Sequence, residues 1–525
     1  MLYYYHYSNY VHMPTSKETK PAALSSIGHM IARLREDRHM TQSELGSKIG
    51  TTQSVIARIE KGEQNLSTET LAKLSEALNH EIVSISKGGT VNFRIEGGRK
   101  LSGSIKVRTS KNGAVGILCA SLLNRGTTII KNAPKIEEVH RITEVLESIG
   151  VKIEWKESDL HITPPEKFDM KHIAYDSAAK TRTIIMMMGS LIHRMNKFDL
   201  PQAGGCRLGS RTVKPYFYAL EKVGVKIETS SEYYHISHNG LKKNREIIMY
   251  EAGDMVTETM LMAAALIPGT TTLKFASANY QVQDVAFYLE LLGVKIEGIG
   301  TSTMTIHGVD TEIRKNIEYY PTEDPIEAMS LIAVAIVTNS AITIERAPID
   351  FLELELLKLE KMGFKYKITK RYKANNGRAN LVDIQTAPSK LKALEEKIHA
   401  NPYPSINADN LPFFVVIGAV AEGETFIHDW LYEERAIYYK ELDKMRAETI
   451  LADPHRFYIK GPTKFKATEI VCPPALRPSV VIMIAMLAAE GTSVLRNVYN
   501  INRGYEDLAS RLNSLGAKIE VFRDL

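Results

Sequence analysis

The sequence predicts an α/β fold of six repeated βαβ-type units, preceded by a small all-α domain. Two observations lead to this prediction. One apolar phrase recurs six times along the chain, and a run of short amphipathic helical patterns precedes its first copy. The chain of 525 residues is long enough for three or four domains of ordinary size.

The composition is that of an ordinary globular protein, with 44% hydrophobic and 24% charged residues. A formal net charge of +5 is small for this length and gives no argument for a nucleic-acid partner. Three scattered cysteines suit neither a disulfide framework nor a zinc site, so we expect a cytoplasmic protein without a metal or a cofactor. No apolar run reaches the 18 residues that predict a membrane-spanning helix, so we expect no membrane partner.

The N-terminal part divides into a tail, a helical domain and a linker. Residues 1–24 lack the apolar core of a signal peptide, and we expect a flexible tail. Residues 25–85 are predicted to form short helices, with a capping box at Thr41 and Glu44 and a tight turn at Gly50, as a helix-turn-helix motif needs. Residues 86–90 form a short glycine-bearing linker.

This helical pattern resembles the XRE-type, lambda-repressor-like DNA-binding domain. The resemblance implies that the second helix of the motif enters the major groove with its N-terminal residues. Gln53 would read an adenine, supported by Thr52 and Ser54. Gln42 and Arg58 would contact phosphates or base edges. The alternative is a helical bundle used for protein contacts or dimerisation, and the seven basic and eight acidic residues of this domain do not decide between them. Because the motif usually works as a two-fold dimer, a homodimer is one expectation.

The recurring phrase organises residues 91–525. In each unit an apolar helix ends at a glycine or a polar turn, a β-branched strand follows, and a second helix ends at the glycine of the phrase before another strand. The copies are LESIGVKIE from Leu146, LEKVGVKIE from Leu220, LELLGVKIE from Leu289, LEKMGFKYK from Leu359, LDKMRAETI from Leu442 and LNSLGAKIE from Leu512, spaced by 74, 69, 70, 83 and 70 residues. Units near 70 residues indicate a duplicated compact fold rather than a solenoid. The 83-residue spacing locates an insertion near 371–398, which we expect to be a polar surface excursion.

A glycine-rich loop, Pro201 to Arg211 with the sequence PQAGGCRLGSR, places Cys206 between two arginines. Glycines let the backbone approach a ligand closely, and arginines favour a thiolate and bind phosphate or carboxylate. One interpretation is a mobile reactive cysteine above an anion site. On chemistry alone, a buried cysteine in an ordinary turn is an equally good interpretation.

The loop and the six units together resemble the UDP-N-acetylglucosamine 1-carboxyvinyltransferase family of enolpyruvyltransferases, whose loop reads Pro-Gly-Gly-Cys-x-Ile-Gly-x-Arg. The resemblance covers about Val91 to Leu525. It implies two lobes of three units each, with the active site in the cleft between them. Lobe one would span about 111–320, and lobe two about 91–110 plus 321–525. The 5-enolpyruvylshikimate-3-phosphate synthases share the fold but not the cysteine loop, and they are the weaker match.

The family moves an enolpyruvyl group from phosphoenolpyruvate (PEP) to the 3′-hydroxyl of UDP-N-acetylglucosamine and releases phosphate. The resemblance implies that Cys206 protonates the PEP methylene carbon and that Asp409 accepts the hydroxyl proton. By itself, Asp409 reads as a helix N-cap. The other family positions fall on Lys111 for the PEP phosphate, Asn112 for the sugar, Arg182 for phosphate, Arg211 at the end of the cysteine loop, Arg477 and Arg503 for the PEP carboxylate, and Glu138 and Arg435 near the ligands. Any one of these arginines could be a plain surface residue, but all of them fall on motif positions in the right order.

The nucleotide end departs from the family pattern. Lys214 stands where the family has an aspartate that touches uracil, and Met249 and Glu251 stand where it has a lysine and a serine that hold the diphosphate. Glu251 would repel a diphosphate, so the acceptor could be a related sugar nucleotide. Three functions stay open: an enzyme that also binds DNA, a regulator whose enzyme-like half senses a sugar nucleotide or PEP without turnover, and an enzyme whose helical module serves assembly. The retained acid, base and arginines favour an enzyme, whereas the altered nucleotide contacts favour a sensor.

Overall fold

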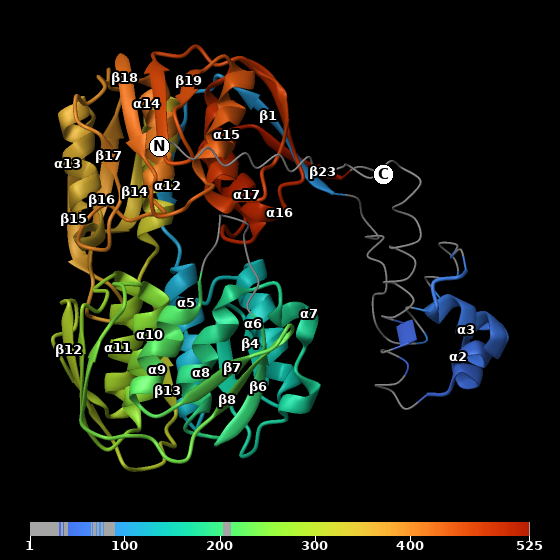
Figure 1. Cartoon of the computed structure of the whole chain (residues 1–525). Coiled ribbons are helices and arrows are strands. Elements are labelled where there is room, and N and C mark those ends of the chain that lie inside the picture. The colour runs from blue at the N-terminus through green and yellow to red at the C-terminus, as the bar shows by residue number, and fades with distance from the viewer. Residues whose placement is uncertain are drawn as a thin grey trace, which may run out of the picture. The chain divides into compact units, whose positions relative to one another are not determined.

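The computed structural model describes residues 31–32, 35, 40–64, 66, 70, 73–74, 77, 90–202 and 212–523 (Figure 1). The chain divides into two compact units, one formed by the residues up to Gly89 and one by Thr90–Asp524. Each unit is described by itself.

The described part of the first unit includes two short helices, α2 (Gln42–Ile49) and α3 (Gln53–Glu60), and further helical residues such as Ile31 and Leu74. The expected capping box is present: the Thr41 hydroxyl accepts from the Glu44 backbone N–H, and the Glu44 side chain accepts from the Thr41 N–H. Gly50 ends α2 with a φ of 73°, in the left-handed region that glycine adopts without a steric cost. Buried apolar side chains hold the two helices together: Ile31, Leu45, Ile49, Ile56, Ile59 and Leu74.

The described residues of the second unit form six sheets, the same number as the copies of the repeated phrase. Three come from the middle of the chain: β13-β3-β5-β4 (Ile317–Tyr319, Thr128–Ile130, Asp159–Thr163, Lys152–Lys156), β6-β8-β7 (Lys197–Pro201, Tyr233–Ser237, Lys226–Thr229) and β11-β12-β10-β9 (Lys295–Glu297, Thr303–Gly308, Gly269–Lys274, Arg245–Ile248). The other three are β15-β16-β14-β2 (Lys365–Lys373, Asn380–Ala387, Ala341–Pro348, Ser102–Lys106), β17-β18-β20-β19 (Ile398–His399, Gly423–His428, Arg456–Gly461, Glu448–Leu451) and β21-β22-β1-β23 (Glu469–Val471, Gly491–Arg496, Val91–Gly97, Ile519–Arg523). The sheets are mixed, because parallel pairs such as β2 with β14 stand beside antiparallel ones.

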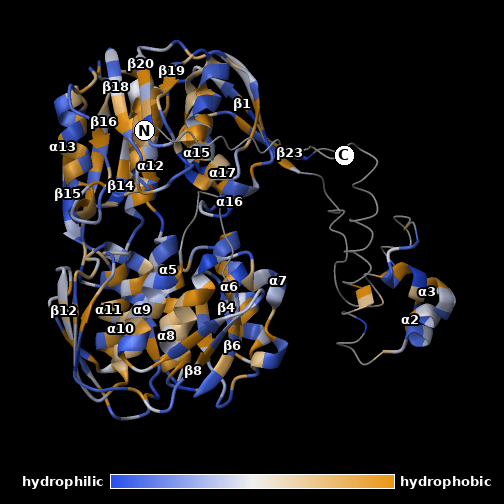
Figure 2. Ribbon diagram, in the orientation of Figure 1, coloured by the Kyte–Doolittle hydropathy of each residue, from blue (hydrophilic) through white to orange (hydrophobic). Residues whose placement is uncertain are grey.

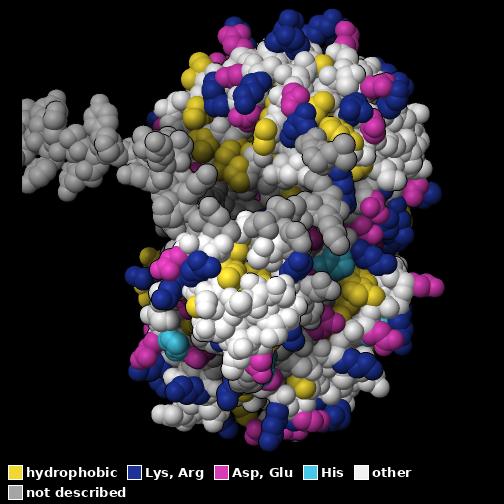
Figure 3. Space-filling model, turned by 90° about the vertical axis from the view of Figure 1, so that its right-hand side faces the viewer, with side chains coloured by type: hydrophobic (Ala, Val, Ile, Leu, Met, Phe, Trp, Pro, Cys, Tyr) yellow, Lys and Arg dark blue, Asp and Glu magenta, His cyan; other side chains and the backbone are white. Residues whose placement is uncertain are grey.

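The first two strands of this unit pair with strands from much later in the chain. Strand β1 lies between β22 and β23, and β2 pairs with β14. We therefore use lobe one for residues 111–320 and lobe two for 91–110 with 321–523. Each lobe has its own apolar core, visible as the orange interiors in Figure 2. Charged side chains of both signs are interspersed over the face drawn in Figure 3.

Apolar helices fill the centre of each lobe. The principal ones are α5 (Lys111–Ala120) and α10 (Asp254–Ala265) in lobe one, and α12 (Pro325–Val337), α14 (Leu411–Val420) and α15 (Leu476–Ala488) in lobe two. Nearly every residue of these helices is buried. None of the helices in the described ranges is long and apolar enough to cross a membrane.

The remaining helices are shorter or lie outside these. They are α6 (Glu137–Ser148), α7 (Tyr175–Ala178), α8 (Met187–Leu191), α9 (Lys214–Lys222), α11 (Tyr280–Leu292), α13 (Glu353–Met362), α16 (Tyr499–Asn502) and α17 (Leu508–Asn513). The 3-10 helices are η1 (Ser121–Leu123), η2 (Met170–His172), η3 (Arg182–Met186), η4 (Ile349–Phe351) and η5 (Ala436–Met445).

The glycine of the repeated phrase has one conformational role throughout. It follows the end of the second helix of its unit in the left-handed region, with φ values of 94° at Gly150, 94° at Gly224, 105° at Gly293, 98° at Gly363 and 97° at Gly516. The copy without this glycine has Arg446 at the equivalent place, with a φ of 70°. A side chain with a Cβ is disfavoured there, so Arg446 occupies a strained position.

The insertion in the fourth unit is mostly regular structure. Much of it extends β15 and β16 into a hairpin, in which Leu381, Val382 and Ile384 are fully buried. The expectation of a surface excursion was therefore wrong for these residues, because Val382 and Ile384 pack in the core of lobe two and Leu381 packs against Ala374 and Ala379 of the hairpin itself.

Replacing the strained arginine should stabilise the protein. Arg446→Gly is expected to raise the free energy of unfolding by up to about 1 kcal/mol, because it removes the left-handed strain of a residue with a Cβ at an exposed site. Gly516→Ala is the matched opposite change, since only the Lys100 carbonyl oxygen, at 3.9 Å, lies near the added Cβ. It should lower the stability by a similar amount. Urea unfolding of both variants checks this, and a loss of stability in Arg446→Gly would contradict it.

Candidate active site

Several expected site residues lie at the N-terminal ends of the buried helices. Lys111 is the first residue of α5, Arg477 is the second residue of α15, and Asp409 lies two residues before α14. The first N–H groups of a helix have no partner within the helix and attract anions. Helix ends from both lobes meet here, because Lys111 of lobe one acts electrostatically on Asp409 of lobe two.

Asp409 is a carboxylate surrounded by cations. Its Oδ2 lies 3.2 Å from Arg477 Nη2, and its Oδ1 lies 3.8 Å from Arg435 Nη1. Burial favours the protonated form of Asp409, but Arg477, Arg435 and Lys111 together hold its pKa below the usual value. The carboxylate is therefore ionised at neutral pH. Asp409 is not the helix N-cap that its sequence context suggested, because Asn410 occupies that position.

Arg435 is fixed by its own carboxylate partner. Its side chain is 1% exposed. Its Nε and Nη2 donate to the two Asp429 oxygens at 2.6 and 2.7 Å, and its guanidinium lies over the Tyr432 ring. Such a two-point contact sets the plane of the guanidinium. The third nitrogen, Nη1, is the one directed at Asp409.

One of the three guanidinium nitrogens of Arg477 has no hydrogen-bond partner among the described residues. Its Nη1 donates to the Tyr505 hydroxyl at 3.0 Å and its Nη2 to Asp409. The buried Nε has no hydrogen-bond partner among the described residues. A buried donor without a partner has a free-energy cost that an anionic ligand would remove.

Glu138 and Arg503 join the two lobes. Arg503 Nη2, in lobe two, lies 2.9 Å from Glu138 Oε2, in lobe one, and the Thr181 hydroxyl donates to the other Glu138 oxygen at 2.6 Å. Burial opposes ionisation of Glu138, yet Lys111 and Arg503 outweigh it and lower the pKa of Glu138 to about 2. Lys111 thus lies close enough to influence both Glu138 and Asp409.

The two remaining described residues of the expected site both lie in lobe one. Asn112 Nδ2 donates to the Tyr280 hydroxyl and to Gln281 Oε1, both at 3.1 Å. Arg182 begins η3 and donates to the Thr212 carbonyl at 2.9 Å. The amide of Asn112 is therefore oriented by α11, and Arg182 is held beside the start of α9.

Cys206 and Arg211 lie outside the described residues, which stop at residue 202 and resume at residue 212. Of the unusual residues at the nucleotide end, Lys214 begins α9, Met249 is buried and Glu251 is exposed.

Sequence reasoning missed the groups that orient the arginines. Asp429 holds Arg435, Tyr505 holds Arg477, and Asp324 acts electrostatically on Arg477. Asp324 had a usable signal, since it precedes a proline and a long apolar run and caps α12 through the Ile326 and Glu327 N–H groups. Asp429 and Tyr505 had none, because their roles depend on contacts made only in the folded chain.

The expected DNA-reading residues lie on and around α3. Thr52, Gln53, Ser54 and Arg58 are exposed. Gln42, on α2, is half-buried; its Nε2 donates to Glu60 at 2.8 Å, and its Oε1 accepts from Gln53 Nε2 at 2.7 Å. Glu60 in turn accepts from Arg35, whose Nε lies 2.6 Å away.

The pKa of Glu138 gives a prediction for stability against pH. The folded pKa of about 2 lies below the ordinary glutamate pKa of 4.5, so the stabilisation is fully present above pH 4.5 and is lost as the pH falls from 4.5 towards 2. At pH 7 we expect Glu138→Gln to lower the free energy of unfolding by on the order of 3 kcal/mol. The deficit should shrink below pH 4.5.

Urea unfolding between about pH 2.5 and pH 7 measures this difference, because the stabilisation is lost as the pH falls from 4.5 towards 2. Glu137→Gln, at the neighbouring position of the same helix, is the control. A deficit that stays constant over this range would assign Glu138 a packing role instead.

Comparisons with known proteins agree with this geometry. A family model described as EPSP synthase (3-phosphoshikimate 1-carboxyvinyltransferase) matches residues 95–512, and a helix-turn-helix model matches residues 31–82. The chain is 33% identical over 438 residues to the UDP-N-acetylglucosamine 1-carboxyvinyltransferase of Treponema denticola, covering 82% of this chain and 99% of that protein. It is 32% identical over 439 residues to that of Bradyrhizobium diazoefficiens, covering 82% and 98%.

Solved structures show the same fold. The enolpyruvyl transferase NikO from Streptomyces tendae has a TM-score of 0.72 at 22% identity and covers 83% of this chain and 100% of its own. An EPSP synthase from Acinetobacter baumannii has a TM-score of 0.63 at 20% identity and covers 82% and 100%. The expected α/β fold and the helix-turn-helix domain are confirmed. With the curated relatives, these matches establish that the chain belongs to the UDP-N-acetylglucosamine 1-carboxyvinyltransferase family of enolpyruvyltransferases.

Proposed function

We propose that the protein transfers the enolpyruvyl group of PEP to the 3′-hydroxyl of UDP-N-acetylglucosamine with release of phosphate, as the first step towards a peptidoglycan precursor, and that its helix-turn-helix domain binds DNA. The observation that carries the enzymatic part is the ionised Asp409 among Arg435, Arg477 and Lys111. The curated relatives bear the name of this activity.

The cations suit the two anionic groups of PEP. Arg477, with its unpartnered Nε, and Arg503 would bind the carboxylate, for which a planar guanidinium is well shaped. Lys111, at the start of α5, and Arg182, at the start of η3, would bind the phosphate. Arg211 would complete this set.

The reaction needs a base and an acid on opposite sides of one addition. Asp409 would accept the proton of the 3′-hydroxyl while the oxygen attacks C2 of PEP, and Cys206 would give a proton to C3. The Cys206 thiolate would then take a proton back from C3, which restores the double bond as the C2–O bond to phosphate breaks, and the departing phosphate would take up the proton held by Asp409. One phosphate leaves for each enolpyruvyl ether formed. The surrounding cations would stabilise the charge that develops on the phosphate.

The acceptor would be a sugar nucleotide, with UDP-N-acetylglucosamine as the first candidate. Asn112, oriented by Tyr280 and Gln281, would hold the sugar. Glu251 is exposed at the nucleotide end, and its charge would repel a diphosphate. A related sugar nucleotide is therefore the second candidate acceptor.

Removal of the base or the acid should abolish turnover while the fold remains. Asp409→Asn and Cys206→Ser are each expected to lower phosphate release from PEP with UDP-N-acetylglucosamine by about 100-fold or more. Asp310→Asn, at an exposed loop position of lobe one, should release phosphate at the wild-type rate.

Phosphate release and calorimetric binding of UDP-N-acetylglucosamine are measured together. If the wild-type protein binds UDP-N-acetylglucosamine but releases no phosphate, the protein is a sensor of the sugar nucleotide and not an enzyme. Wild-type turnover in Asp409→Asn would remove that residue from the mechanism.

The orientation of the Gln53 side chain on α3 supports the DNA-binding part of the proposal. The Gln42–Gln53 hydrogen bond takes one N–H of the Gln53 amide and fixes its orientation. Its other N–H and its Oε1 would then make a two-point contact with an adenine edge. Glu60, which accepts a hydrogen bond from Arg35, accepts another from the Gln42 amide and so fixes the orientation of Gln42.

Gln53→Ala should weaken specific binding at the adenine that Gln53 contacts by about 1–3 kcal/mol. Gln64→Ala, beyond the other end of α3, should bind the same DNA as the wild type does. Sites selected from random duplexes with the wild-type protein provide the probe for a fluorescence-anisotropy titration. If no duplex is enriched, or if both variants bind equally, α3 is not the reading helix and the module serves protein contacts.

A further inference from the structure

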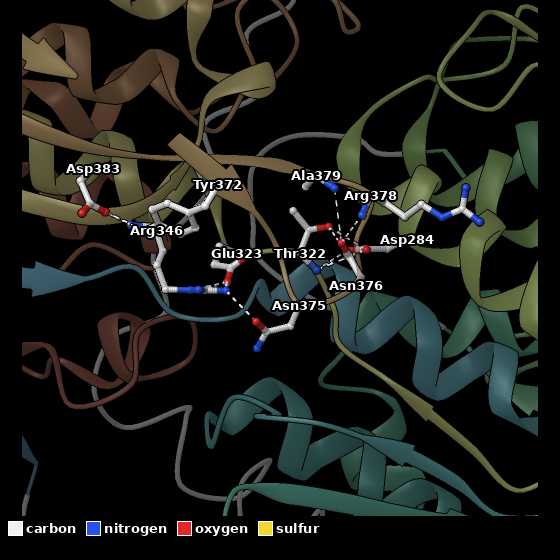
Figure 4. Close-up of polar contacts among 10 residues, drawn as sticks. All are labelled: Asp284, Thr322, Glu323, Arg346, Tyr372, Asn375, Asn376, Arg378, Ala379 and Asp383. Carbon is white, nitrogen blue, oxygen red and sulfur yellow. Dashed lines mark hydrogen bonds and ion pairs between the residues drawn. The ribbon is translucent and has the colours of Figure 1, made fainter. Parts of the chain in front are cut away.

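The fourth repeated unit carries a hairpin that is longer than its counterparts. Strands β15 and β16 have nine and eight residues, whereas β4 and β5, at the same place in the first unit, have five each. The extension ends in a turn, residues 374–379, which we call the hairpin tip. The tip belongs to lobe two, and Figure 4 shows that it lies against residues of lobe one and of the connection between the lobes.

Two side chains of the hairpin tip reach out of lobe two. Asn376 Nδ2 donates to the Thr322 hydroxyl at 3.1 Å. Arg378 Nη2 lies 3.0 Å from Glu290 Oε2 on α11 of lobe one, and its guanidinium lies 4.7 Å from the centre of the Phe287 ring on the same helix. The tip thus makes a polar contact with the connection and a charged and aromatic contact with the far lobe.

The shape of the tip aims these side chains. Asn376 Oδ1 accepts from the backbone N–H groups of Arg378 and Ala379, at 2.9 and 3.3 Å. Gly377 has a φ of 70°, which allows the tight turn. Because the amide oxygen is used inside the tip, the amide nitrogen of Asn376 points outward to Thr322.

The contacted connection is one of two chain segments that cross between the lobes. The crossing segments, residues 107–110 and 320–324, run side by side: the Ser110 N–H donates to the Thr322 carbonyl at 2.9 Å, and the Asp324 N–H donates to the Arg108 carbonyl at 2.8 Å. The first segment leads directly into Lys111, and the second ends at the N-cap of α12.

Side chains of both lobes bind the second crossing segment. On the lobe-one side, the Asp284 carboxylate accepts from the Thr322 N–H and hydroxyl. On the lobe-two side, Arg346 Nε donates to Glu323 at 2.7 Å, and Arg346 Nη2 donates to Asn375 of the hairpin tip at 3.4 Å (Figure 4).

We propose that the hairpin tip is a positioning element that fixes the angle between the lobes, through Asn376 on the crossing segment and Arg378 on α11. It adds a non-covalent link beside the two covalent ones. At a hinge, a small rotation becomes a larger displacement away from the crossing segments, where Arg503 of lobe two must reach Glu138 of lobe one. The catalytic consequence of this element rests on the function proposed above, but its effect on the lobes does not.

The test measures the angle and the activity separately. Spin labels at Lys171→Cys in lobe one and Lys460→Cys in lobe two, both exposed positions, report the distance between the lobes by pulsed electron resonance. A Cys206→Ser background restricts labelling to these sites, since Cys119 and Cys472 are buried. The variant is the pair Asn376→Ala with Arg378→Ala, and the control is Arg371→Ala, an exposed arginine of the same hairpin.

Without substrates, the paired variant should show a broader and longer distance distribution than the parent and the control. In the native-cysteine background, its kcat/KM should fall about tenfold, through kcat and KM together, because substrate binding must then close the lobes unaided. A purely structural role would lower the thermal midpoint and leave the distances unchanged. Identical distance distributions in variant and parent would overturn the proposal, whatever the activity. If the paired variant changes the distance distribution but the wild-type protein has no activity, the positioning role of the hairpin tip stands and the proposed reaction is wrong.

Discussion

The N-terminal ends of the buried helices, whose first N–H groups find no partner within the helix, are the constraint on which the rest of the structure depends. The first turn of each helix has N–H groups that the helix cannot pair, so the ends of α5, α12, α14 and α15 must meet polar groups or ligands. Their apolar bodies can lie only inside the lobes. The polar ends consequently collect where the lobes meet, together with the charged side chains that neighbour them in sequence.

The charges gathered there are arranged before any ligand arrives. Each buried arginine is held by a fixed partner, Arg435 by Asp429 and Arg477 by Tyr505. Asp409 lies against both arginines, and their attraction outweighs its burial. A site built in this way does not have to reorganise its dipoles during the reaction, which is the main means by which enzymes stabilise developing charge.

Local rules recovered the features that lie within a few residues of one another. The six copies of the phrase, the capping box at Thr41 and the turn at Gly50 all follow from such rules, and the structure confirms them. The family motifs, taken in order along the chain, predicted the cations at the helix starts. The structure brings two of them, Lys111 and Arg477, close to Asp409.

The features that sequence reasoning missed depend on distant contacts. The Asp429 partner of Arg435 is visible only in the folded chain. The hairpin of the fourth unit read as a polar excursion because β15 is rich in lysine, as edge strands often are, while its partner β16 supplies the buried face. The N-cap of α14 is Asn410 and not Asp409. Asn and Asp are about equally favoured at an N-cap, so the sequence does not distinguish the two positions.

The pairing of β1 with β23 has a consequence for how the protein is made. Arg94 and Glu520 are bonded across 426 positions of the chain. At a synthesis rate of about 5–20 residues per second, β1 waits roughly 20 to 85 s for its last neighbour. Lobe one is complete long before then, because all its strands lie between residues 128 and 319. Lobe one therefore has time to fold during synthesis, while β1 of lobe two still lacks the neighbouring strand that Ile519–Arg523 supply.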